Sequence, residues 1–144
     1  MRILALVIMA LSTHATLGQA AEAPQPLNTD KVHIPQKGSA EEALRDGLKL
    51  IAAGEFKRWR ERYCHEDKLC RTKEATKSLF AFNLPAAQKL VAHCLRGEQD
   101  EGLSITRRVS RGEELKLFLA CNPKGMPRPF SLEKEGRAWK FTKI

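Results

Sequence analysis

The side chains that could perform acid–base or nucleophilic chemistry are few, and they are spread along the sequence. Downstream of residue 20, the candidates are the one tyrosine, the three histidines and three of the four aspartates: Tyr63, His33, His65, His93, Asp46, Asp67 and Asp100. A serine hydrolase needs a serine, a histidine and a carboxylate in contact, and no spacing here argues for such a group. The glycine-containing turns also lack the spacing of a phosphate-binding P-loop. The sequence therefore indicates no catalytic residue and no cofactor, and we expect a protein that is not an enzyme.

The four cysteines are the other reactive groups, and they permit three disulfide pairings. We predict the pairs Cys64–Cys70 and Cys94–Cys121, because the first spans a short polar loop and the second joins a predicted helix end to a predicted strand end. The alternative is a metal site formed by Cys64, His65, Cys70 and His93. Zinc sites favour cysteines separated by only two residues, and disulfides suit an exported chain, so we expect no metal.

The first 20 residues have the layout of a secretory signal peptide. Met1-Arg2 supplies a positive start, residues 3–11 (ILALVIMAL) are all apolar, and Gly18-Gln19-Ala20 places small residues at a cleavage site. The apolar run is far shorter than the roughly 20 residues that span a bilayer. We therefore expect cleavage near Ala20, a periplasmic or secreted protein without a transmembrane anchor, and an oxidising environment for the cysteines.

The chain is basic, with 25 lysines and arginines against 17 aspartates and glutamates and a formal net charge of +8. Four of the cations lie close together on a predicted helix and form a candidate basic face: Lys57, Arg58, Arg60 and Arg62. Such a face attracts anionic polymers, membrane surfaces or acidic proteins. The simpler interpretation is that the face is solvated and serves solubility alone. No recognised nucleic-acid-binding motif accompanies it.

Helices are expected in the first half of the mature chain. Residues 21–39 contain several prolines and no apolar period, which predicts an extended flexible leader. Ser39 and Glu42 form a capping box that predicts the start of a helix, and Gly54 ends it. Two further helices are expected over 55–63 and 84–95, the last with Ala87, Leu90, Val91, Cys94 and Leu95 facing inward. The apolar stretch 79–82 fits either a short strand or the entry to the last helix.

From Gly102 onward the apolar residues alternate with polar ones, which indicates β-strands. Turns are expected at 111–112, 122–125 and 135–136, and they divide this part of the chain into an antiparallel meander of about four strands. Helices followed by a curved antiparallel sheet are typical of an α+β fold. We expect a single α+β domain over 40–144, with the N-terminal helices packed on the sheet.

Two stretches of the sequence resemble the nuclear transport factor 2-like superfamily: ALRDGLKLIAAGEFKRWRERY and FSLEKEGRAWKFTKI. The likeness is carried mainly by Ala53-Gly54-Glu55-Phe56 and by the pattern of Glu135, Gly136, Trp139 and Lys140. The superfamily has a cystatin-like α+β fold in the shape of a cone, and it includes enzymes and non-catalytic binding domains. The resemblance implies an interior pocket, with Trp59, Tyr63, Phe118 and Trp139 as candidate lining residues, and it carries over no catalytic residue.

Arg107 is a further candidate for this pocket. It shares strand parity with Ile105 and Val109, so it would point into the cone and could receive a carboxylate or another anion. A sheet edge or a β-bulge would turn it outward instead.

The sequence leaves several function classes open. The first is an exported, non-catalytic binding domain that engages a macromolecular partner in the cell envelope or outside, for example as an inhibitor or an immunity-type protein. The second is a pocket for a small apolar or anionic ligand inside the cone. The third is cationic binding of an anionic polymer or a membrane surface through the basic face.

Overall fold

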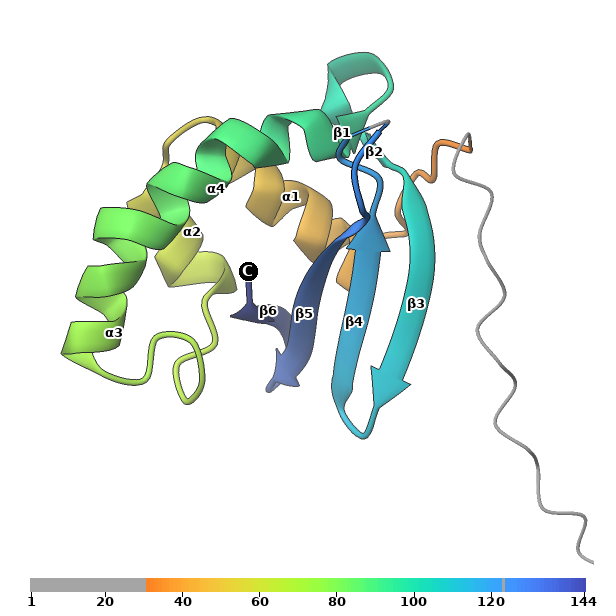
Figure 1. Ribbon diagram of the computed structural model, residues 1–144. Helices are drawn as coiled ribbons and strands as arrows, with labels where there is room; N and C mark the ends of the chain where they lie inside the picture. Colours follow the sequence, from red (N-terminus) through yellow and green to blue (C-terminus); the bar gives the residue numbers. More distant parts are fainter. Residues whose placement is uncertain (1–30, 123) are drawn as a thin grey trace, which may run out of the picture.

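The computed structural model describes residues 31–122 and 124–144, so the predicted signal peptide and residues 21–30 of the predicted leader lie outside the described residues. The helical elements are α1 (Ala40–Ala52), α2 (Phe56–Tyr63), α3 (Lys73–Ser78), the π-helical turn η1 (Leu79–Asn83), α4 (Leu84–Val91), and the 3₁₀ turns η2 (Ala92–Cys94) and η3 (Glu98–Asp100). The strands are β1 (Leu95–Arg96), β2 (Gly102–Leu103), β3 (Ile105–Arg111), β4 (Glu114–Leu119), β5 (Arg128–Glu135) and β6 (Ala138–Lys143). The predicted α+β fold is confirmed (Figure 1).

The main sheet is the predicted antiparallel meander of four strands. Its order, β3-β4-β5-β6, follows the sequence, while β1 and β2 form a separate two-stranded sheet. Burial alternates along the C-terminal half of β4, whereas four successive residues of β5, 130–133, are buried. Leu117 and Leu119 of β4 and Phe130 and Leu132 of β5 are fully buried. These side chains lie on the face that the helices cover, with α1 in contact with both β5 and β6.

Helix α1 begins where the capping residues predict. The Ser39 hydroxyl accepts a hydrogen bond from the Glu42 amide at 3.1 Å, which is the expected half of the capping box. The Glu42 carboxylate bonds the amide of Gly38 at 2.6 Å, one residue earlier than the reciprocal bond of a capping box. The first turn of α1 is therefore fixed from both sides.

The core is centred on an aromatic pair that joins α2 to the last strand. Trp59 and Phe141 are both fully buried, and their ring centroids lie 5.5 Å apart in an edge-to-face arrangement. Gly47 of α1 allows this pair to approach the helix, because a β-carbon there would lie 2.5 Å from the ring of Phe141. The core therefore requires glycine at this helical position.

The segment from α3 to α4 is helical throughout and contains a wide turn in its middle. The Leu84 amide bonds the carbonyl of Leu79, five residues back, which makes η1 a π-helical turn. The wide turn precedes Pro85, whose ring would clash with the carbonyl four residues earlier in a regular α-helix. Of the two predictions for 79–82, the helix entry is therefore the one observed.

The side of α4 that faces the core differs in one residue from the prediction. Leu84, Ala87 and Val91 are buried as the apolar spacing requires, whereas Leu90 is 45% exposed. The prediction that Leu90 faces inward is wrong. Leu84, Ala87 and Val91 form one stripe along α4, and Leu90 is turned by about 100° from Val91 around the helix axis, which places it beside that stripe.

Both predicted disulfides are present. Cys64 and Cys70 are bonded, as are Cys94 and Cys121, and the described residues contain no free cysteine. The first closes the loop between α2 and α3, and the second joins the end of the long helical segment to Cys121, two residues after the end of β4. The loop containing the first disulfide also meets the edge of the sheet, where the His65 amide bonds the carbonyl of Phe141 at 3.0 Å.

Residues 31–39 are attached to the domain rather than free. The backbone of His33 exchanges two hydrogen bonds with Leu103 of β2, at 2.8 and 2.9 Å. The side chain of Val32 lies directly over Gly102, which has no β-carbon to obstruct it. This part of the predicted leader therefore differs from the flexible segment that its composition indicates, because its backbone adds to a strand.

None of the helices in the described part of the chain is long and apolar enough to cross a bilayer.

Candidate functional site

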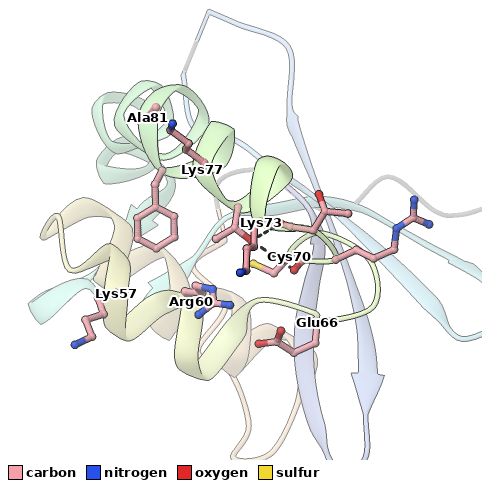
Figure 2. A pocket seen from close by; sticks show the side chains of 11 residues that line it. Lys57, Arg60, Glu66, Cys70, Lys73, Lys77 and Ala81 are labelled. Carbon is pink, nitrogen blue, oxygen red and sulfur yellow. Dashed lines mark hydrogen bonds between the residues drawn. The ribbon is translucent and has the colours of Figure 1, made fainter.

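A groove of about 840 Å³ lies between α2 and the facing helix formed by α3 and η1 (Figure 2). We call it the basic groove, and its lining residues are Lys57 and Arg60 from α2, Glu66, Cys70, Arg71 and Thr72 from the connecting loop, and Lys73, Thr76, Lys77, Phe80 and Ala81 from α3 and η1. The residues from α3 and η1 are spaced by three, one, three and one, which places them on a single helical face.

The two helices form a hairpin, and different contacts hold its two ends. At one end, Phe56 and Phe80 meet edge to face with their ring centroids 6.4 Å apart. At the other end, the Cys64–Cys70 disulfide closes the connecting loop. Thr72 then caps α3 through a hydrogen bond from the Ala75 amide at 3.0 Å. The walls of the basic groove are therefore fixed by packing, a covalent bond and a helix cap.

The charges in the basic groove are nearly all positive. It contains five cationic side chains and one carboxylate, that of Glu66, so its net charge is +4. The cations are Lys57, Arg60, Arg71, Lys73 and Lys77. Within the described chain, none of the five forms an ion pair or donates a side-chain hydrogen bond, in contrast to Arg45, Lys49 and Lys68. The basic groove is thus a concentration of uncompensated positive charge.

Arg60 is the most enclosed of these cations. Its side chain is half-buried, and its Nε is buried without a hydrogen-bond partner among the described residues. A buried donor without a partner costs about 1–3 kcal/mol. Arg60 also lines the basic groove, where an anion could accept hydrogen bonds from the terminal nitrogens of its guanidinium group.

The structure divides the basic face that the sequence predicts on α2. Lys57 and Arg60 line the basic groove, whereas Arg58 forms an ion pair with Glu55 and, like Arg62, does not line the groove. The reason is the helical period, since residues three apart share a side of the helix and the intervening ones are turned by about 100° per residue. Half of the predicted face therefore belongs to the candidate site.

The residues predicted to line a cone pocket do not surround a common cavity among the described residues. Trp59 is enclosed in the core against Phe141, and Tyr63 is half-buried with its ring centroid 6.5 Å from the same phenylalanine. Burial, followed by the charge of Asp46, raises the pKa of the Tyr63 hydroxyl, so this group stays neutral at pH 7. Trp139 packs on the core with Lys134 5.5 Å from its ring centroid.

Arg107 and Phe118 lie on the other face of the sheet. The register of β3 and β4 shifts between Ile105 and Arg107, and this bulge turns the arginine away from the core. Its guanidinium group stacks on the ring of Phe118 at 4.0 Å, and Phe118 alternates with the buried Leu117. Of the two orientations predicted for Arg107, the outward one at a β-bulge is the one observed.

The three histidines of the described residues lie on different elements and do not meet. His33 pairs with β2, His93 lies in η2, and His65 lies in the disulfide loop with its Nδ1 3.4 Å from a carboxylate oxygen of Glu135. The amide of Glu66 also donates to that oxygen, so Glu135 ties the loop to the β5–β6 turn. The described residues contain no group of three or more histidines, cysteines and carboxylates that could hold a metal ion.

A second, smaller hollow of about 570 Å³ lies beside the Cys94–Cys121 disulfide. Its apolar residues are Leu90 and Met126, the latter 92% exposed. Its cations, Lys89 and Arg128, are fewer than those of the basic groove. We therefore treat the basic groove as the candidate site.

The sequence contained only part of the signal for the basic groove. Lys57 and Arg60 are visible as a cluster of cations on an amphipathic helix. Arg71, Lys73 and Lys77 lie in a polar segment without an apolar period, so the sequence did not place them on a wall facing α2. The spacing of Lys73, Lys77 and Ala81 by four residues is the signal that could have done so.

Comparison of the chain with protein families, with curated proteins and with solved structures found no match. The resemblance to the nuclear transport factor 2-like superfamily accordingly stays a prediction.

Proposed function

We propose that this protein is a non-catalytic binding domain that engages an anionic macromolecular partner through the basic groove. The observation that carries the proposal is the set of five cations around one concave surface, none of which has a carboxylate partner in the described chain. A net charge of +4 in one groove draws an acidic partner toward it and orients that partner on approach.

Solubility alone does not account for this arrangement. Charged groups improve solubility wherever they lie on the surface, and like charges one helical turn apart repel each other by a few tenths of a kcal/mol. Elsewhere in the described chain some exposed cations, such as Arg58 and Lys68, lie beside carboxylates, and others, such as Arg62 and Lys89, form no ion pair. What distinguishes the basic groove is that five cations lie around one hollow. A concave surface that gathers cations and leaves them unpaired is better suited to receiving negative charge from another molecule.

The disposition of the acid–base groups supports a binding function rather than catalysis. His65 has a carboxylate neighbour, and both belong to the contacts that hold the disulfide loop on the sheet. Catalysis by a histidine needs a second reactive group within hydrogen-bond reach of substrate. The lysines and arginines of the basic groove can donate hydrogen bonds to an anion. An ammonium or guanidinium group has no hydrogen-bond acceptor and does not act as a base.

We propose further that the protein acts outside the cytosol. The two disulfides fit an oxidising compartment, and they brace the two ends of the helical segment from 73 to 94. The signal-peptide layout of residues 1–20 agrees with this location.

A binding measurement with a matched pair of variants tests the proposed function. We expect fluorescein-labelled poly-glutamate to bind the wild-type protein, with an affinity that falls roughly tenfold between low and moderate salt. The double variant Lys73→Glu/Lys77→Glu should lose this binding. The control Arg58→Glu/Arg62→Glu changes the net charge equally but lies outside the basic groove, and it should keep most of the affinity. Equal losses in the two variants would show that only net charge matters and would refute the site.

A further inference from the structure

We infer that the natural occupant of the basic groove is a segment of another protein, namely an acidic amphipathic helix that carries a cation near one end. The inference rests on the proposed function, because it specifies the partner of the same site. Three features of the basic groove support the inference: its apolar floor, the arrangement of its cations, and the position of its single carboxylate.

The floor of the basic groove is apolar. Phe80 is half-buried against Phe56, Ala81 is exposed beside it, and the Cys70 sulfur belongs to the closing disulfide. A polyphosphate or a sulfated glycan has no apolar group to place there. An amphipathic helix does, because its apolar side chains recur every three or four residues along one face. The apolar floor therefore favours a protein segment.

The cations form two facing rows. Lys57 and Arg60 lie three residues apart on α2, and Lys73 and Lys77 lie four residues apart on α3, as Figure 2 shows. Each interval is about one helical turn, or about 5.4 Å along the axis. Carboxylates at the same interval along the two flanks of an incoming helix would meet a cation on each side. The apolar stripe between those flanks would then lie over Phe80 and Ala81.

The carboxylate of Glu66 favours a protein segment over a uniform polyanion as the occupant of the basic groove. It lies in the connecting loop, at the end of the basic groove where α2 finishes, and Figure 2 shows it apart from Lys77 and Ala81. Its amide bonds Glu135 at 3.0 Å, which fixes the backbone from which its carboxylate projects. A continuous chain of negative charges would be repelled there, whereas a helix with a lysine or an arginine at that end would be attracted. Glu66 therefore sets the direction of the bound helix.

A selection experiment identifies the chemistry of the occupant. The wild-type protein, with its disulfides intact, is used to select from a library of random displayed peptides, and the Lys73→Glu/Lys77→Glu variant is used in parallel. We expect the wild type to enrich peptides with acidic residues on two flanks of an apolar helical stripe, and the variant to lose them. If the variant enriches the same peptides, the basic groove is not the site and the proposed function fails as well.

Two single substitutions then test the specific inference on a selected peptide and on inorganic polyphosphate. Glu66→Lys should weaken the peptide and strengthen polyphosphate, each by roughly two- to fivefold, the range of a partly exposed charge pair. Ala81→Gln should weaken the peptide and leave polyphosphate unchanged, and the control Ala86→Gln, outside the basic groove on α4, should affect neither. If wild-type protein enriches acidic peptides without apolar residues, and Glu66→Lys strengthens both ligands, the occupant is a polyanion. That result overturns this inference and leaves the proposed function intact.

Discussion

At the scale of single residues, neighbouring arginines on α2 have opposite environments. Arg58 is neutralised by Glu55 on the exposed side of the helix, whereas Arg60 is half-buried with an unpartnered Nε in the basic groove. Both belong to the same basic cluster in the sequence. Glu55, three residues before Arg58 at the start of the same helix, is a local partner that the sequence displays, whereas the burial of Arg60 depends on contacts with other parts of the chain.

A residue-scale prediction concerns Gly47. Its replacement by alanine places a β-carbon 2.5 Å from Cε2 of Phe141, a fully buried ring that cannot move freely. Overpacking of this kind costs about 1–3 kcal/mol, and the higher helix propensity of alanine returns up to about 1 kcal/mol. We expect Gly47→Ala to lower the free energy of unfolding by about 1–2 kcal/mol in urea titrations.

A double-mutant cycle with Phe141→Leu provides the control. The smaller side chain should relieve the clash, so the double variant should lose less stability than the sum of the two single variants. Strict additivity would contradict the assigned contact.

At the scale of elements, the disulfides hold different parts of the helical segment. The Cys64–Cys70 bond fixes the loop that carries Glu66 and Arg71 into the basic groove, whereas Cys94–Cys121 lies at the opposite end of the helical segment, outside the groove. The two bonds should therefore affect stability and binding in different ways.

Removal of each disulfide separates these effects. In the chain-entropy model, Cys64→Ser/Cys70→Ser loses about 2.4 kcal/mol of stability and Cys94→Ser/Cys121→Ser about 3.6 kcal/mol. Below the melting temperatures of both variants, we expect only the first to bind poly-glutamate more weakly, since its loop lines the basic groove. Equal affinities, measured by fluorescence anisotropy, would show that the loop does not contribute to the site.

A second prediction at the scale of elements concerns the pH dependence of the contact between residues 31–34 and β2. The pKa of His33 lies below its ordinary value of 6.5, first because of burial and then because of the charges of Arg108 and Lys31. A detached segment would take up a proton near pH 6.5 more readily than an attached one, so the attachment is strongest above that pH and weakens as the pH falls through it. Hydrogen-exchange protection of the Leu103 amide, corrected for intrinsic rate, should decrease from about pH 7.5 to about pH 5.5.

The control is His33→Gln, which has no ionisable side chain and should show the same protection at both pH values. If wild-type protection does not change with pH, the titration of His33 does not govern this contact.

The elements that could be predicted are those with a clear period or a strong local signal. The Ser39 cap, the break at Gly54, the alternation of Leu117 and Leu119, and both disulfide pairs are local or nearly local patterns. The segment 71–83 has no such period, and Pro85 is accommodated by a π-helical turn that changes the helical phase. For that reason the sequence did not predict the second wall of the basic groove.

At the scale of the whole molecule, the sheet contributes to the hydrophobic core, whereas the helical hairpin forms the candidate binding surface. The sheet and α1 bury the aromatic pair of Trp59 and Phe141, whereas α2, α3 and their loop form the basic groove at the outer side of the helical layer (Figure 1). On the opposite face of the sheet lies a second set of cations, Arg107, Arg111 and Lys116, accompanied by Glu114 and Phe118. The proposed function of the basic groove therefore depends on which of these two basic surfaces an acidic ligand binds.

Titration of the ¹⁵N-labelled protein with poly-glutamate, followed by NMR, tests this choice most directly. We expect the largest shifts at the amides of Lys57, Lys73 and Lys77 and at the Nε–H of Arg60, because the Arg60 guanidinium group lines the basic groove. Shifts confined to the outer face of the sheet around Arg107 and Arg111, with the Arg60 Nε–H unchanged, would contradict the assignment of the basic groove as the binding site.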